Sequence, residues 1–263
     1  MARVSSSMLI RIFVLTVIIL LARPASAEDA ATKIAWKMQK FDKHLPGCDQ
    51  KPVRNCASVQ FVYPEIISGP SQGRAEISSA IHDMLLTPIE KGKEAGDAEG
   101  FAQQILAHYQ SWLKRGGDAK LSWAVERKID VDNSSPNAFS IRLLERVEHG
   151  KARPAKNTVY FNFRPEDGTL IQLSELIRPD RMSEFKAIAQ KHFNNKDRKV
   201  PAGEDAKAPG QEFSLPKNFA IEKDGLRFRY EEDQVDPHSI RTPEFVVPYS
   251  EIRNLLQRGV TLP

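Results

Sequence analysis

The sequence predicts an α+β fold, in which antiparallel β-sheet segments pack against about three amphipathic helices. Two observations lead to this prediction. Several strand-like runs alternate apolar and charged residues, which is typical of antiparallel sheets with one face in water. Three longer segments instead repeat apolar residues at helical spacing. With 263 residues, the chain is long enough for one large domain or for two small ones that share a sheet.

The first 27 residues have the features of a secretory signal peptide. Arg3 and Arg11 precede an apolar run from Ile12 to Ala22, and the small residues Ala25-Ser26-Ala27 follow it. The run is about half of the ~20 residues that a membrane span needs, so we expect cleavage near Ala27 and no membrane span afterwards. The mature chain is therefore expected to be periplasmic or secreted.

The charge balance argues against nucleic acid as a partner. The full chain has 38 Lys and Arg against 34 Asp and Glu. Loss of Arg3, Arg11 and Arg23 with the signal peptide leaves 35 against 34, a net charge of +1. A nearly neutral, exported chain is not expected to bind nucleic acid.

The two cysteines of the chain, Cys48 and Cys56, are predicted to form a disulfide. In an oxidising compartment such a pair closes a small loop, here the one that contains Pro52. A redox-active pair is the alternative, although the CxxC spacing typical of that chemistry is missing.

The N-terminal half contains strands, then two helices, then strands. Between Lys33 and Tyr63, two runs of period two flank the cysteine loop and predict an antiparallel pair. Apolar residues at helical spacing predict helices near 74–90 and 98–115, the second ended by Gly116-Gly117. Alternating runs near 121–131, 139–148 and 159–163 predict three further strands.

The C-terminal half begins with a helix predicted near 180–193. The segment from Asn194 to Glu212 is rich in Pro, Gly, Lys and Asp, and we expect an exposed loop there. A hairpin across Asp224-Gly225 follows. A last strand contains Phe245, and a short helix that begins at Ser250 closes the fold.

Several of these segments together resemble a known family. They are YFNFRPEDGTLIQLSELI, a helix, NFAIEKDGLRFRY and EFVVPYSEIRNLL, in that order. The chain in this way resembles the C-terminal domain of the RsiV-like proteins, a family of exported bacterial domains. Some members are partners of deacetylases, and one is the lysozyme-sensing ectodomain of an anti-sigma factor. The earlier segment VQFVYPEIISG with its following helix resembles the small PdaC-type domain that usually precedes it.

The resemblance implies three segments and an α+β framework. The segments are a signal peptide at 1–27, a PdaC-like domain at 28–155 and an RsiV-like domain at 156–263. The chain departs from the family pattern in two loops, one around His149 and one from Glu231 to His238. Both loops are expected to meet a ligand, so we regard His149 and His238 as candidate ligand-binding residues.

The loop after the hairpin gives the most specific functional hypothesis. Glu231, Glu232, Asp233 and Asp236 lie close together between two predicted strands. Like charges held close repel one another, which favours a cationic partner that neutralises them. Lysozyme is strongly basic and would be such a partner. The alternative is a solvated turn whose charges prevent edge pairing of the hairpin.

One short motif suggests, as an alternative function, that the protein is a hydrolase. Gly69-Pro70-Ser71-Gln72-Gly73 matches the GxSxG pattern of a nucleophile elbow and lies between a predicted strand and a predicted helix. An elbow needs a parallel sheet with strands and helices alternating downstream, whereas three water-facing strands follow one another here. We therefore favour an ordinary Pro/Gly turn.

The remaining histidines do not predict a metal site. His82, His108 and His192 fall within predicted helices without the spacing of metal ligands. We expect no metal and no cofactor. The sequence as a whole predicts an exported cell-envelope binding protein without catalytic activity, whose ligand is lysozyme or a peptidoglycan fragment. An envelope hydrolase or deacetylase accessory, and a structural protein without a ligand, are the alternatives.

Overall fold

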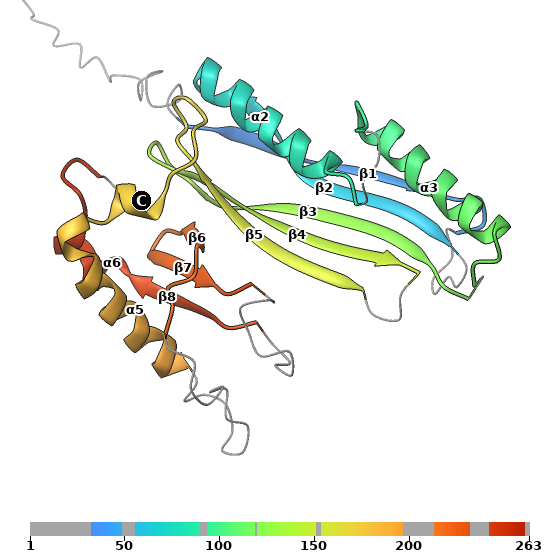
Figure 1. Ribbon diagram of the computed structural model, residues 1–263. Coiled ribbons are helices and arrows are strands. Elements are labelled where there is room, and N and C mark those ends of the chain that lie inside the picture. The colour runs from blue at the N-terminus through green and yellow to red at the C-terminus, as the bar shows by residue number, and fades with distance from the viewer. Residues whose placement is uncertain are drawn as a thin grey trace, which may run out of the picture.

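The computed structural model describes residues 33–48, 56–89, 94–118, 120–150, 154–196, 213–231 and 242–260. The fold is α+β, as predicted, with one five-stranded and one three-stranded sheet (Figure 1). The predicted signal peptide lies outside the described residues, and so do residues 197–212 of the predicted loop. None of the helices in the described ranges has the length and hydrophobicity that a membrane crossing requires.

The large sheet is mixed, which the sequence did not predict. Its strands follow the chain in order. They are β1 (Ala35–His44), β2 (Ala57–Ser68), β3 (Trp123–Ser134), β4 (Phe139–His149) and β5 (Ala155–Phe163). All neighbours are antiparallel except β2 and β3, which are parallel. The reason is that two helices connect β2 to β3 and return the chain to the end of the sheet where β2 began, as a parallel pair requires.

The two connecting helices lie on one face of the large sheet (Figure 1). They are α2 (Ser71–Leu86) and α3 (Ala98–Lys114). The first was predicted near 74–90 and ends earlier because Thr87 precedes Pro88, which disfavours helical geometry. Asp97 caps the second, since its side chain accepts from Gly100 N at 2.7 Å. The core between these helices and the sheet includes the fully buried Phe61, Ile77 and Ile129.

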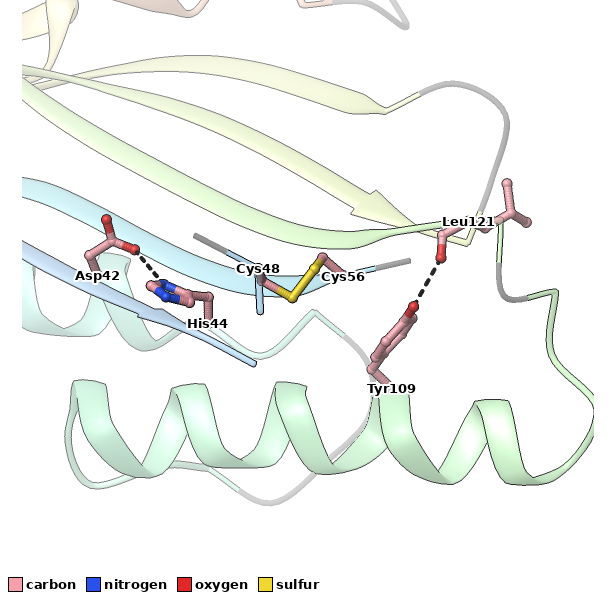
Figure 2. The surroundings of a disulfide bond; sticks show 6 residues. All are labelled: Asp42, His44, Cys48, Cys56, Tyr109 and Leu121. Atoms are coloured by element: carbon pink, nitrogen blue, oxygen red, sulfur yellow. Dashed lines mark hydrogen bonds and ion pairs between the residues drawn. A yellow bond between two sulfur atoms is a disulfide. The ribbon is translucent and has the colours of Figure 1, made fainter. Parts of the chain in front are cut away.

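The predicted disulfide is present. Cys48 and Cys56 are joined with their Cα atoms 5.7 Å apart, close to the end of β1 and the start of β2 (Figure 2). The neighbouring Tyr109 of α3 is fully buried, and its hydroxyl donates to Leu121 O at 3.3 Å. The disulfide therefore fastens the connection between the first two strands at the end of the sheet that α3 covers.

A buried arginine lies under the helices, on the apolar face of the large sheet. Arg127 on β3 is 2% exposed, although its neighbours Val125 and Ile129 are typical core residues. Its guanidinium donates to Leu85 O at 2.7 Å and to Glu145 Oε1 at 2.8 Å. The arginine thus connects the end of α2 to strands β3 and β4.

The small sheet is a three-stranded antiparallel meander covered by one helix (Figure 1). The elements around and within it follow in chain order. They are α4 (Leu173–Leu176), η1 (Pro179–Arg181), α5 (Met182–Lys196), β6 (Asn218–Ile221), β7 (Gly225–Arg229), β8 (Glu244–Pro248), α6 (Tyr249–Ile252) and η4 (Arg253–Leu255). Helix α5 continues to Lys196, beyond the start of the predicted loop at Asn194. Phe185 on α5 and Phe228 on β7 form the centre of this second core, with ring centroids 5.9 Å apart.

Two buried asparagines join the small sheet to the large one. Asn218, at the start of β6, is 6% exposed. Its side-chain oxygen accepts from Tyr160 N at 2.8 Å, and its side-chain nitrogen donates to Thr158 O at 2.7 Å. An amide side chain thereby occupies the position of a neighbouring strand at the edge of β5.

Asn162 on β5 makes the reciprocal connection and is 3% exposed. Its side-chain nitrogen donates to Phe219 O at 2.8 Å, while its oxygen accepts from Ile221 N at 2.8 Å. Ser140 Oγ on β4 donates to the same oxygen at 2.8 Å. Each asparagine thus satisfies backbone groups of the opposite sheet, and we refer to the pair as the asparagine bridge.

Removing the buried guanidinium of Arg127 should lower the free energy of unfolding much more than removing an exposed charge from the same strand. Arg127→Met leaves Leu85 O and the Glu145 carboxylate without their donor, so we expect a loss of about 3 kcal/mol in the free energy of unfolding. Lys128→Met, on the opposite face, should cost less than about 1 kcal/mol. Urea denaturation of both variants measures the difference, and equal losses would contradict the role given to Arg127.

Candidate functional site

The predicted acidic loop connects β7 to β8, and the structure describes its base. Tyr230 N donates to Pro243 O at 3.1 Å and closes this base. Glu231 follows it and is exposed. The other predicted residues of this loop, Glu232, Asp233, Asp236 and His238, lie outside the described residues.

An aromatic cluster holds the base of the loop. Phe193 on α5 contacts Tyr230 and Phe245 with ring centroids 5.4 and 5.8 Å away, and Phe213 also packs on it. The Tyr230 hydroxyl donates to Ser214 O at 2.9 Å. Burial raises the pKa of Tyr230 to about 12, so this hydroxyl stays protonated and keeps its donor role at neutral pH. The residues at the base of the loop are therefore packed against an aromatic cluster.

Beside this base, two arginines neutralise two glutamates on the polar face of the small sheet. Arg227 donates to Glu244 at 2.6 Å and to Glu222 at 2.9 Å, and Arg229 donates to Glu244 at 3.0 Å. Burial disfavours the charged form of Glu244, but the hydrogen bonds from both arginines outweigh it and lower the pKa of this carboxyl. We call these four residues the ion-pair row.

The connection between β7 and β8 is strongly acidic in sequence. Four carboxylates and one arginine, Arg241, lie between Tyr230 and Thr242 in the sequence, which gives this connection a formal charge of −3. In the adjoining strands, each glutamate of the ion-pair row is matched by an arginine. The arrangement suits electrostatic attraction of a cationic surface better than proton transfer.

The polar face of the large sheet contributes a second charged group near the row. Asp132 on β3 pairs with Arg142 on β4 at 3.3 Å, and the Asp132 Oδ2 atom is buried without a hydrogen-bond partner among the described residues. Burial raises the pKa of the Asp132 carboxyl; Arg142 opposes this effect, and Glu222 of the ion-pair row adds to it. Arg227 of the ion-pair row acts in the opposite sense to Glu222 and lowers the pKa of this carboxyl.

The other predicted ligand residue, His149, belongs to the large sheet. It ends β4, where it pairs with Trp123 in register and packs against the indole with ring centroids 3.7 Å apart. It lies nine positions along the strand from Ser140, which is at the asparagine bridge. At about 3.3 Å per residue, this places His149 roughly 30 Å along β4 from the bridge. His149 therefore lies in the large sheet, whereas Glu231 follows β7 of the small sheet.

The GxSxG segment has a packing role in the structure. Gly73 lies where α2 contacts the turn after β5: its N–H donates to Glu166 O at 3.1 Å, and a Cβ atom there would lie 1.8 Å from Pro165 O. Gly69 has a φ of +139°, and a Cβ atom there would meet the side chain of Ile34 at 2.6 Å. Both glycines are thus explained by close contacts, whereas Ser71 is an exposed first residue of α2.

In the ranges that the structure describes, no three His, Cys, Asp or Glu side chains lie close enough to hold a metal ion. His192 contacts Glu251 at 2.9 Å and His82 contacts Asp83 at 3.8 Å. Glu251 also pairs with Lys191 at 3.6 Å.

The sequence reasoning missed the asparagine bridge and the ion-pair row. Arg227 and Arg229 alternate with apolar residues in β7, so the pattern did indicate that they share a face. The alternation in β7 did not indicate that this face would lie towards the large sheet. Asn162 and Asn218 had no signal of their own, because isolated asparagines in strands are not distinguished by periodicity.

The comparisons with known proteins agree with the architecture. Residues 163–250 match the model of a family described as "Protein of unknown function (DUF3298)". This match includes the small sheet, its helix and the acidic loop. No match was found among curated proteins.

Two solved structures are similar in fold over most of this chain. A DUF3298 family protein from Pseudomonas aeruginosa PAO1 is 13% identical, with a TM-score of 0.64 over 88% of this chain and 97% of that one. A DUF3298 family member from Bacteroides fragilis is 14% identical, with a TM-score of 0.64 over 86% of this chain and 94% of the other. At such identities the likeness shows the fold alone.

Neutralising the buried carboxylate of Asp132 should stabilise the protein at neutral pH. Because its pKa is raised by folding, the protonated carboxyl is favoured in the folded protein, and the stability that it contributes is lost as the pH rises through the folded-state pKa. Asp132→Asn imitates the protonated form. We expect a gain on the order of 1 kcal/mol at pH 7 that shrinks as the pH falls towards the ordinary aspartate pKa of about 4.

The measurement is urea denaturation of both proteins across this pH range. Glu126→Gln, on the same strand, is the control, because Glu126 pairs with Arg146 at 2.7 Å and its loss should not stabilise the fold. A gain for Asp132→Asn that is the same at pH 4 and pH 7 would rule out titration as its cause.

Proposed function

We propose that the protein is an exported, non-catalytic binding protein of the cell envelope, similar in role to the RsiV-like ectodomain that it resembles. Its ligand is a cationic protein, for which lysozyme is the model. The single observation that carries the proposal is the acidic connection of formal charge −3, whose base is packed against an aromatic cluster. The four carboxylates are close together in the sequence, and a basic partner would relieve the repulsion between like charges.

Two further observations support an exported protein. The Cys48–Cys56 disulfide is a bond that persists in oxidising compartments such as the periplasm. The N-terminal sequence has the signal-peptide pattern described above. A peptidoglycan fragment is the second candidate ligand, on the basis of the resemblance to envelope domains, and enzyme accessory function is the alternative class.

The electrostatic mechanism predicts that lysozyme binds at low ionic strength and that the loop carboxylates are responsible. The triple variant Glu231→Gln, Glu232→Gln, Asp233→Asn should weaken the affinity at least tenfold, about 1.4 kcal/mol. High salt should weaken wild-type binding in the same direction, because exposed charges are screened. Isothermal titration calorimetry at two ionic strengths measures both effects.

A matched control separates the loop from the overall charge of the molecule. Glu76→Gln, Asp83→Asn, Glu94→Gln removes the same number of exposed carboxylates from α2 and its following connection. This control should bind lysozyme nearly as well as the wild type. Absence of binding at low salt, or equal weakening in both triple variants, would refute the proposal.

A further inference from the structure

The first strand of the large sheet has one open edge. The strands are ordered from β1 to β5, so β1 and β5 are the two edge strands (Figure 1). The asparagine bridge covers part of β5. None of the ten residues of β1 is buried. An exposed edge strand presents backbone N–H and C=O groups with which another strand can pair.

The backbone groups on this edge belong to alternate residues. Leu45 N donates to Ala57 O at 3.1 Å, and in an antiparallel ladder such hydrogen-bonded pairs recur at every second residue. The odd-numbered residues of β1 therefore bond to β2, and the even-numbered ones from Trp36 to His44 direct their backbone groups outward. Among the described residues, these even-numbered residues make no backbone hydrogen bond to a segment outside the large sheet.

Unopposed charge does not protect this edge. Lysines on an edge strand usually keep a second strand away, because their charges repel one another. Each lysine of β1 already has a carboxylate partner. The pairs are Lys37–Glu65, Lys40–Asp42 and Lys43–Glu99. The charges of the lysines and their partners cancel, so the edge attracts neither an acidic nor a basic strand in particular.

The sequence of β1 is instead complementary to itself in one antiparallel register. With Phe41 opposite Phe41 of a second copy, Lys40 of each copy lies opposite Asp42 of the other. Opposed residues of opposite charge stabilise an antiparallel pair, and like charges destabilise it. The two neighbouring registers of the same kind place Lys40 opposite Lys40, or Asp42 opposite Asp42. Charge therefore selects the first register among the three.

The same register also suits the apolar side chains of β1. Phe41 packs against Phe61 with ring centroids 5.7 Å apart, and Phe61 contacts Phe101 of α3. At the centre of the paired strands, the two Phe41 rings would extend this core across the interface. Met38 is 46% exposed in the single chain, and the neighbouring strand would cover part of it.

We propose that two copies of this chain pair through β1 in this antiparallel register, so that their five-stranded sheets form one continuous sheet. The Lys40–Asp42 pairs between the copies fix the register. Each copy keeps its small sheet at β5, the opposite edge of its large sheet. The interface does not rest on the function proposed above, because the acidic connection belongs to the small sheet.

Sedimentation velocity over a range of concentrations tests this pairing on the protein without residues 1–27. The wild type should form dimers as the concentration rises. Lys40→Asp and Asp42→Lys should each weaken dimerisation at least about tenfold, because each turns both opposed pairs into pairs of like charge. A mixture of the two variants should dimerise as well as the wild type. In that mixture, the aspartates of one copy lie opposite the lysines of the other.

Two controls make the result specific to this interface. Lys186→Asp changes the net charge equally at an exposed position on α5 and should dimerise like the wild type. Hydrogen exchange reports the register: the amides of Lys40 and Asp42 should become protected in the dimer, whereas Gln39 and Phe41 already bond to β2. A wild type that is monomeric at every concentration, a mixture that stays monomeric, or equal effects of Lys186→Asp and Lys40→Asp would overturn the proposal.

Discussion

The asparagine bridge is the interaction on which the arrangement of the two sheets depends. β5 is the last strand of the large sheet, and an edge strand presents backbone groups that need partners. The side chain of Asn218 satisfies two of these groups, and Asn162 does the same for β6. A side-chain amide has an N–H donor and a C=O acceptor, as a peptide group does. The two sheets can therefore be joined without a continuous ladder of backbone hydrogen bonds. The small sheet is thereby held against the polar face of β4 and β5.

The sequence predicted the local elements well and their assembly less well. Period-two alternation located the strands, and the Asp224-Gly225 turn located the hairpin, where Gly225 is needed because a Cβ atom would lie 2.5 Å from Val247 O. The parallel pairing of β2 and β3 was not predicted, because pairing direction depends on where the helices return the chain. Arg127 was also missed, since a charged residue in the apolar register is indistinguishable from an irregularity until its partners are known.

For the site, the sequence located residues but not their surroundings. The acidic connection was identified by composition, and the structure adds the aromatic support around Phe193 and the paired glutamates below it. His149 was grouped with the same ligand site because both loops depart from the family pattern. The structure places His149 against Trp123 at the end of β4 instead. Proximity in three dimensions depends on register and on sheet docking, and neither was available from the pattern of residues.

The most direct test of the account is whether the asparagine bridge makes the two sheets unfold together. Trp36, Trp112 and Trp123 all belong to the large sheet or its helix α3, so their fluorescence reports on that part alone, while far-ultraviolet circular dichroism reports on both sheets. For the wild type, urea unfolding followed by the two signals should coincide. For Asn162→Ala with Asn218→Ala, the dichroism should begin to change at lower urea than the fluorescence. Coincident curves with an unchanged midpoint in the double variant would contradict the account.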